Sequence, residues 1–154
     1  MEKQELVGFK RLRVWQKAYE LTLQVYRLTH ILPKEEMYSL NSQLRRAAAS
    51  VAANISEGYE RNHRKEYVQF LYMAKGSLGE LETYFCLAKD LGYIVDKHYS
   101  PIESLRVDTV KLLSGLIRSL TGPRTLDPGP KSSGLIRSLT GPRTPDPGPK
   151  VHVR

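Results

Sequence analysis

The chain has 154 residues, of which 40% are hydrophobic, and a formal net charge of +8 at pH 7. This length suits one domain with its own core, but not two full domains. No apolar run approaches the roughly 18 residues of a membrane span, and the N-terminus lacks the apolar segment of a signal peptide, so we expect a cytoplasmic protein with no membrane partner. The basic excess favours an acidic partner such as nucleic acid, although it also serves solubility.

Four segments show apolar residues at helical spacing, at about 12–31, 39–58, 63–91 and 100–120. Pro33 ends the first, because a proline disfavours the helical conformation of the residue before it. Gly92 ends the third. Ser100, Pro101 and Glu103 combine a capping box with a proline at the first helical position, which predicts that the fourth helix begins there. We therefore expect an all-α fold, an up-down-up-down four-helix bundle over residues 1–121.

The predicted helices differ in how much apolar surface they carry. The first has an apolar arc too wide for one neighbour, with Leu12, Trp15, Tyr19, Thr22 and Tyr26 on one stripe and Val14, Ala18, Leu21, Val25 and Leu28 on the next. The fourth looks like an ordinary bundle helix with a single core stripe. That stripe consists of Ile102, Leu105, Thr109, Leu112, Leu116 and Leu120.

The second and third predicted helices carry a second stripe beside the core stripe. A bundle that stays monomeric does not need it, whereas small residues at helical spacing let another backbone come close. The second stripe therefore predicts a homo-oligomer interface. Its residues are Arg46, Ser50, Ala53, Glu57, Tyr72, Gly76, Gly79 and Thr83.

Residues 122–154 form a second region that contains a duplication. The sequence SGLIRSLTGPRTLDPGPK from Ser114 returns from Ser133, and the only change is Pro145 in place of Leu126. The second copy has no bundle position left to fill, and its many prolines cannot support a packed core. We expect a disordered, basic, Pro/Gly-rich tail.

The sequence contains no recognisable catalytic or metal-binding motif. The four histidines lack ligand spacing, and the glycines around Gly76 lack the strand and the lysine of a phosphate-binding loop. Glu57, Glu80 and Glu82 lack the Glu-x-x-His motif of di-iron bundles and are better explained by ion pairs. Cys86 is the only cysteine, and its place in a helix predicts a packed thiol. We expect neither catalytic residues nor a metal or other cofactor.

Cations gather at one end of the predicted bundle. In an up-down-up-down arrangement the start of the first helix, the turn between the second and third, and the end of the fourth share one pole. Such a surface suits phosphate contacts, and Tyr59 and Tyr67 nearby could stack on bases, although each side chain alone could simply be solvated, core or interface. This basic pole comprises Lys10, Arg11, Arg13, Arg61, Arg64, Lys65 and Arg118.

Two runs in the chain carry a family resemblance. ANISEGYER from Ala53 and FLYMAKGSLGELET from Phe70 resemble the four-helix-bundle proteins encoded in intervening sequences of bacterial 23S ribosomal RNA genes, a family that includes the accessory variability proteins of diversity-generating retroelements. The similarity runs from near Phe9 to near Leu120, and Ser56 stands where alanine is more usual. The resemblance implies a ring-like homo-oligomer, a pentamer, with nucleic-acid or reverse-transcriptase binding in some relatives.

These observations lead to one functional hypothesis and its alternatives. We expect a non-enzymatic homo-oligomer that binds RNA or DNA through the basic pole. The alternatives are an adaptor that docks a reverse transcriptase or another enzyme, and a purely structural ring.

Overall fold

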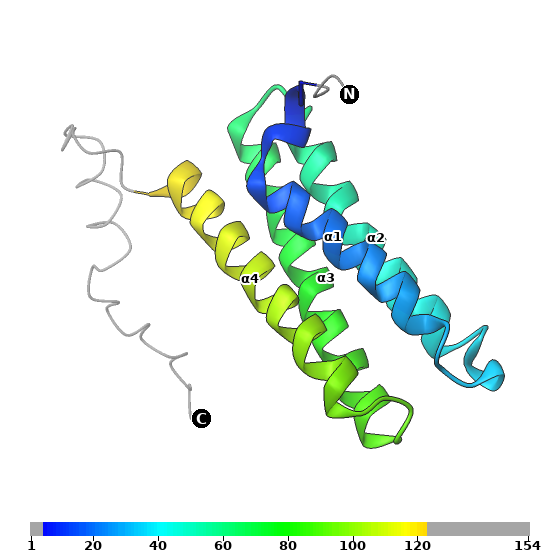
Figure 1. Cartoon of the computed structure of the whole chain (residues 1–154). Coiled ribbons are helices and arrows are strands. Elements are labelled where there is room, and N and C mark those ends of the chain that lie inside the picture. Colours follow the sequence, from blue (N-terminus) through cyan, green and yellow to red (C-terminus); the bar gives the residue numbers. More distant parts are fainter. Residues whose placement is uncertain (1–4, 123–154) are drawn as a thin grey trace, which may run out of the picture. The chain divides into compact units, whose positions relative to one another are not determined.

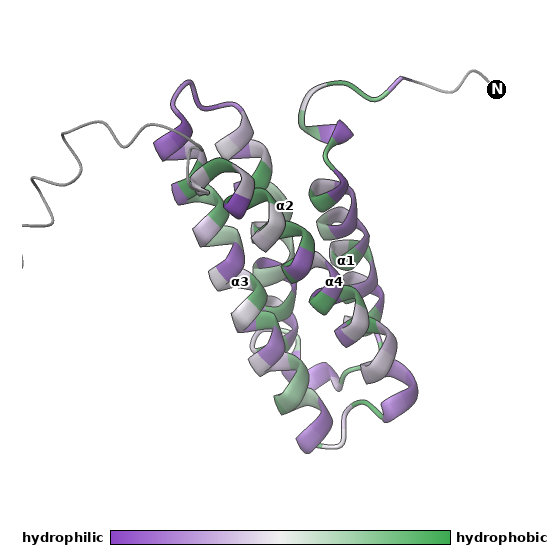
Figure 2. Ribbon diagram, turned by 90° about the vertical axis from the view of Figure 1, so that its left-hand side faces the viewer, coloured by the Kyte–Doolittle hydropathy of each residue, from purple (hydrophilic) through white to green (hydrophobic). Residues whose placement is uncertain are grey.

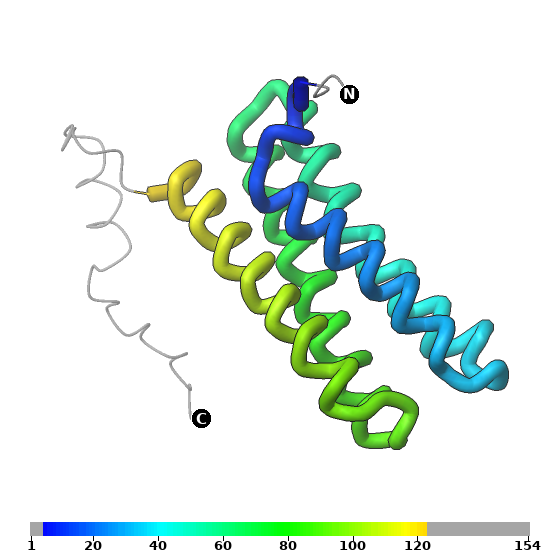
Figure 3. Tube along the Cα trace, in the orientation of Figure 1, coloured from blue at the N-terminus to red at the C-terminus, as the bar shows by residue number. Residues whose placement is uncertain are grey.

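Four long helices make up the part of the chain that the computed structural model describes, residues 5–122 (Figure 1). Figure 3 follows the trace and shows that successive helices run in opposite directions through short connections, which confirms the predicted all-α up-down-up-down bundle. The predicted tail falls almost entirely on residues 123–154, which lie outside the described residues. The elements are η1 (Gly8–Arg11), α1 (Arg13–Thr29), η2 (Lys34–Glu36), α2 (Leu40–Tyr59), α3 (Arg64–Asp90) and α4 (Asp96–Thr121).

Each long helix packs against two neighbours around a shared core. α1 and α3 both contact α2 and α4, and within residues 5–122 the diagonal pairs do not touch. In Figure 2 hydrophobic and hydrophilic residues alternate around the helices, and the turn between α2 and α3 is hydrophilic. The arrangement removes one apolar stripe of every helix from water. The large side chains that are fully buried include Leu21, Leu44, Ile55, Leu71, Leu78, Leu81, Phe85 and Leu113.

Only one of the two apolar stripes of α1 enters this core. The buried stripe is the one that contains Ala18, Leu21 and Val25, each 0% exposed. On the other stripe, Tyr19 and Tyr26 stay 48% and 42% exposed. The wide apolar arc of α1 is therefore left partly open at the surface.

The start of α4 differs from the prediction. The helix begins at Asp96, about a turn early, and Pro101 lies inside it, so the predicted capping box at residue 100 is wrong. The backbone N–H of Val95 instead bonds Nδ1 of His98 (3.4 Å), and the Lys89–Asp96 ion pair (2.9 Å) ties the new start to α3. The ion pair with Lys89 is a tertiary contact, and Pro101 leaves one helical hydrogen bond of α4 unmade.

The buried face of α4 lies against both α1 and α3. Leu113 is fully buried and Ile117 is 6% exposed, whereas Leu112 and Leu116, predicted for the core stripe, are only half-buried. The buried side is also the side of Arg106, which is 6% exposed and reaches α3. The prediction of a single core stripe on α4 is therefore confirmed. In the second half of the helix the stripe is centred one residue later than predicted, on Leu113 and Ile117.

Arg106 joins α3 to α4 through a charge cluster in which Arg106 is buried and Glu82 is 53% exposed. Its guanidinium makes two hydrogen bonds to the Glu103 carboxylate (2.8 and 2.6 Å), donates to the Leu78 carbonyl oxygen (3.3 Å) and pairs with Glu82 (3.1 Å). The Glu103 carboxylate is the main reason why the pKa of Arg106 is raised. A buried cation with this many partners is stable in the folded protein. Removing Glu103 would leave the buried Arg106 charge with less compensation, and removing Arg106 would leave the Glu103 carboxylate without its partner.

α2 and α3 approach closely at Gly58. A Cβ atom added there would lie 2.8 Å from the Phe70 Cβ and 3.0 Å from the Tyr67 ring. Further along the same contact, the hydroxyls of Ser50 and Ser77 lie 2.8 Å apart and form a hydrogen bond. By contrast, a Cβ atom on Gly76 would meet nothing within 4 Å. Gly58, and not Gly76, is the glycine that close packing within the protomer requires.

Alanine substitutions at these two glycines should have opposite effects. Gly58→Ala should lower the free energy of unfolding by about 1 to 3 kcal/mol, because the added methyl overpacks a tight contact. Gly76→Ala should not lower stability, and in the isolated protomer it should gain roughly 0.5 to 1 kcal/mol from reduced backbone freedom in the unfolded chain. Urea denaturation followed by circular dichroism measures both. Equal effects of the two substitutions would contradict this explanation of the α2–α3 contact.

Candidate nucleic-acid interface

Aromatic contacts assemble one end of the bundle from three chain segments. The Phe9 ring of η1 lies 6.5 Å from Tyr59 at the end of α2, and Tyr59 lies 6.2 Å from Tyr67 near the start of α3. Phe9 also packs on Trp15 of α1, with ring centroids 5.2 Å apart. These contacts hold η1 and the first turn of α1 beside the α2–α3 turn, and so bring together the chain segments of the basic pole.

The structure gathers six of the seven predicted cations around these rings. Lys10 and Arg11 lie on η1, and Arg13 begins α1. The others lie at or next to the α2–α3 turn: Arg61, Arg64 and Lys65. Arg118 is exposed in the last turn of α4. Figure 1 shows the end of this helix at the same end of the bundle but off to one side.

Two of these cations are neutralised by carboxylates. Arg11 pairs with Glu5 (3.2 Å), and Arg61 pairs with Glu57 while its guanidinium carbon lies 4.7 Å from the centroid of the Phe70 ring. Within residues 5–122 the remaining five cations form no ion pair: Lys10, Arg13, Arg64, Lys65 and Arg118.

Three of the cations occupy helix starts, where positive charge is unfavourable. Arg13 is the first residue of α1, and Arg64 and Lys65 open α3. A helix N-terminus already carries partial positive charge, so a cation there costs stability of about 0.3 to 1 kcal/mol instead of adding it. The C-termini of α2 and α4 lie at the same pole and offset the dipoles of α1 and α3, so the positive potential comes from the side chains, of which the cations outnumber Glu60 and Glu66. This excess of cations favours anions.

The two tyrosines predicted to stack on bases differ in accessibility. Tyr59 is 40% exposed at the pole. Tyr67 is half-buried, and burial, followed by the nearby Tyr59, raises the pKa of its hydroxyl. Tyr59 is the better placed of the two to meet a ligand. Phe9 and Trp15 were not predicted to join this cluster. Phe9 lies before α1, and the fold brings its ring to Trp15 and Tyr59.

The residues predicted for an oligomer interface are largely open to solvent. Ser50 is the exception, since it is half-buried and bonded to Ser77 of the same chain. The prediction that Cys86 is packed is wrong, because its thiol is exposed on α3. The exposed interface candidates are Arg46, Ala53, Glu57, Tyr72, Gly76, Gly79 and Thr83.

The described residues show no arrangement suited to metal binding. No group of three or more His, Cys, Asp or Glu side chains within residues 5–122 is placed to hold a metal ion. A groove of about 430 Å³ lies between α1 and α4, away from the basic pole, and has an apolar floor that includes Leu28 and Ile102. Within residues 5–122 no helix is both long enough and apolar enough to cross a membrane.

The opposite end of the bundle is closed by Glu36. Its carboxylate accepts hydrogen bonds from the Ser39 hydroxyl, the Leu40 backbone N–H (3.3 Å) and the Tyr93 hydroxyl (2.9 Å). It thus links η2 and the start of α2 to the α3–α4 turn. These hydrogen bonds, that from Ser39 above all, lower the pKa of Glu36, and the same carboxylate raises the pKa of Tyr93.

The fold and the basic pole define a class of small all-α four-helix proteins without a recognisable catalytic centre in the described part. Residues 10–115 match the family model described as 23S rRNA-intervening sequence protein. The chain belongs to this family, as its resemblance in residues 53–61 and 70–83 predicted.

Solved structures support the fold. The chain is similar to a crystal structure of a protein with unknown function from the S23 ribosomal protein family of Bacteroides thetaiotaomicron, with a TM-score of 0.64 and 24% sequence identity. The alignment covers 68% of this chain and 98% of that one. No curated protein matches the chain.

The contacts of Glu36 predict a stability change in acid. Because the folded-state pKa lies below the ordinary value of 4.5, the carboxylate stabilises the fold above that pH, and this stabilisation is lost as the pH falls through the folded-state pKa. Glu36→Gln should lower the melting temperature at neutral pH, and the deficit should shrink as the pH falls below 4.5. Glu35→Gln is the neighbouring control. A deficit that is independent of pH would contradict the role of the charge.

Proposed function

We propose that this protein is a non-enzymatic nucleic-acid-binding protein that contacts RNA or DNA phosphates through the basic pole. The observation that carries the proposal is the convergence of cations from η1, α1 and the α2–α3 turn, with Arg13, Arg64 and Lys65 at helix starts where they destabilise the isolated helices. Phosphate contacts need such a surface and carry little sequence information. Membership of a family encoded in ribosomal RNA genes is compatible with this function.

We also propose that the protein assembles into a homo-oligomer. The outer side of α3 supports this, because Tyr72 and Met73 are 53% and 55% exposed beside Gly76 and Gly79, whose backbone is uncovered. The stripe around Ala53 lies on α2, whereas that around Gly79 lies on α3. Two unlike surfaces on each protomer are what a cyclic, head-to-tail ring such as a pentamer requires.

The basic pole should dominate the salt dependence of binding. Replacing Arg13, Arg64 and Lys65 together by Gln should weaken binding to duplex DNA and lower the slope of log affinity against log salt by about 0.9 for each phosphate that the variant no longer neutralises. Fluorescence anisotropy titrations at several salt concentrations measure both quantities.

A charge-matched control exists at the other end of the bundle. Arg27, Lys34 and Lys97 are exposed there, and their joint replacement by Gln removes the same net charge. If the two triple variants bind equally, binding follows net charge alone and the basic pole is not the site.

The α3 surface predicts how the oligomer can be broken. Gly76→Glu should keep the helical content, because the site is open within the protomer, but it should lower the mass measured by light scattering. Gly115→Glu is the matched control, since Gly115 of α4 is equally open. A wild-type protein that is already monomeric at micromolar concentration would contradict the proposed assembly.

A further inference from the structure

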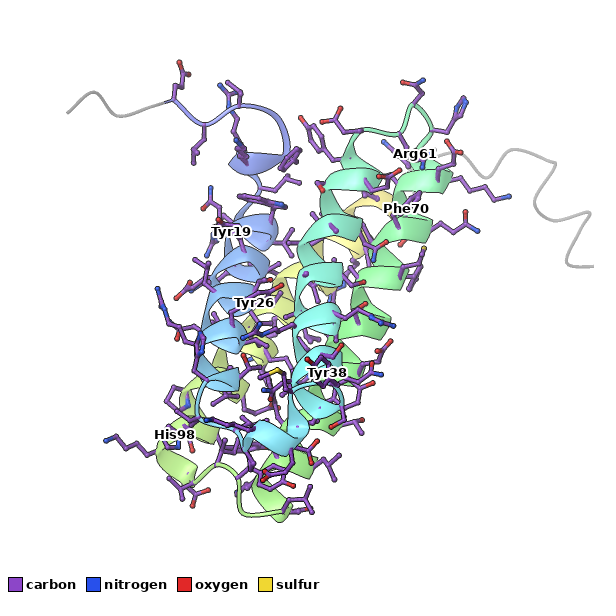
Figure 4. All side chains as sticks on the ribbon, turned by 90° about the vertical axis from the view of Figure 1, so that its right-hand side faces the viewer. Tyr19, Tyr26, Tyr38, Arg61, Phe70 and His98 are labelled. Atoms are coloured by element: carbon purple, nitrogen blue, oxygen red, sulfur yellow. The ribbon has the colours of Figure 1, made fainter. Side chains whose placement is uncertain are left out.

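A row of aromatic side chains runs along the outer side of α1, next to α2. The rings of Trp15 and Tyr19 stack, with centroids 5.1 Å apart and an interplanar angle of 14°, and Tyr26 follows about two helical turns later. Tyr19 is 48% exposed and Tyr26 is 42% exposed. Figure 4 shows both tyrosines on the face where α1 and α2 lie side by side. The protomer therefore presents flat aromatic surface to solvent over about 10 Å of helix.

The α2 side of this face is made of small side chains. The Thr22 hydroxyl donates to the Ala48 carbonyl oxygen (3.0 Å) and marks where the two helices touch. At helical spacing the α2 positions turned toward the aromatic row are Ala49, Ala52 and Ser56. Because these side chains reach little beyond the backbone, they leave Tyr19 and Tyr26 partly exposed, although Trp15 stacks on Tyr19.

Arg45 of α2 places a cation beside the row. Its Nε donates to the hydroxyl of the buried Thr29 (2.9 Å), and its guanidinium carbon lies 4.8 Å from the centroid of the Tyr26 ring. Within residues 5–122 Arg45 forms no ion pair. A guanidinium held over a tyrosine is placed to contact a phosphate next to a base stacked on a neighbouring ring.

The charge of this face favours a polyanion over a second copy of the chain. Residues 10–29 and 39–56, which supply the face, contain one acidic residue, Glu20, and it pairs with Lys17 (3.6 Å). A second protomer that met the face across a two-fold axis would bring like charges together, whereas a chain of phosphates would neutralise them. The basic residues of the two segments are Lys10, Arg11, Arg13, Lys17, Arg27, Arg45 and Arg46.

We propose that this aromatic row binds single-stranded nucleic acid, with bases stacked on Tyr19 and Tyr26 and phosphates beside Arg45. The proposal rests on the proposed function and specifies its ligand. Phosphate contacts at the basic pole accept single strands and duplexes alike, but an exposed ring can stack only on a base that is not already stacked in a duplex. Phe9 connects the row to the pole through Trp15 and Tyr59, so one strand can contact both surfaces.

The test compares single-stranded and duplex probes on the full chain. A fluorescently labelled oligothymidylate of about 12 nucleotides, a typical site size for stacking proteins, and a duplex of the same length are titrated with wild type and with the double variant Tyr19→Leu, Tyr26→Leu. Leucine keeps apolar bulk at half-exposed positions but removes the ring. We expect at least a roughly 10-fold loss of affinity for the single strand and little change for the duplex.

Two further measurements make the test specific. Tyr38→Leu removes an exposed ring elsewhere, 92% exposed, and should leave both affinities unchanged. Trp15 is the only tryptophan in the chain and stacks on Tyr19, so its emission should be quenched by the oligothymidylate and not by the duplex.

Each other outcome decides against the aromatic row. An equal loss of affinity for the single strand and the duplex, or no loss for either, would overturn the proposal. A lower light-scattering mass of the Tyr19→Leu, Tyr26→Leu variant would also overturn it, because the face would then be an interface between copies of the chain. Duplex binding that depends on Arg13, Arg64 and Lys65 together with unchanged single-strand binding in the tyrosine variant would leave the proposed function intact while removing the row. A wild-type protein that binds neither probe fails both proposals.

Discussion

The close approach of α2 and α3 at Gly58 is the constraint on which the candidate site depends. With no side chain there, the Tyr67 and Phe70 side chains pack directly on the α2 backbone, at distances that a Cβ atom would not allow. This packing fixes where α3 starts relative to the end of α2, and it places Tyr59 against Tyr67. Tyr59 in turn holds Phe9, so that η1 and its cations sit beside the turn. The gathering of cations at the pole thus depends on the tight packing of α3 against Gly58 of α2.

The two ends of the bundle are built differently. At the basic pole, aromatic rings do the packing, and several cations are left without ion-pair partners within the described residues. At the other end, Glu36, Tyr93, Lys89 and Asp96 are tied into hydrogen bonds and an ion pair that close the turns. Charges that already have partners contribute to the fold, whereas unpaired charges at a helix start oppose it. The other end also has cations that form no ion pair within residues 5–122: Arg27, Lys34 and Lys97. However, Glu35 and Asp90 lie among them, and Lys97, the one of the three at the start of a long helix, directly follows Asp96. The excess of unpaired cations at two helix starts is the physical argument for a ligand at the basic pole.

Much of the fold was predictable because helical periodicity is a local property. The four helices were predicted to within a few residues, except for the start of α4, where Asp96 and Ile94 make tertiary contacts that outweigh the local preference of Pro101 for a helix start. The exposed Cys86 was mispredicted for a related reason. Its helical position was right, but which side of α3 meets a neighbour depends on where α2 and α4 lie.

The sequence by itself determined the helix count, the order of the elements, the family and the gathering of cations at one pole, because each follows from spacing along the chain or from a local motif. Only the tertiary structure decided which apolar stripe of α1 is buried, since both stripes have the right period and the packing of α2 and α4 selects one. It also decided that Arg11 and Arg61 are neutralised while Arg64 and Lys65 form no ion pair within residues 5–122. Finally, it placed Arg45 of α2 beside the stripe of Tyr19 and Tyr26 on α1, because a contact between two helices depends on their relative rotation, which no single segment encodes.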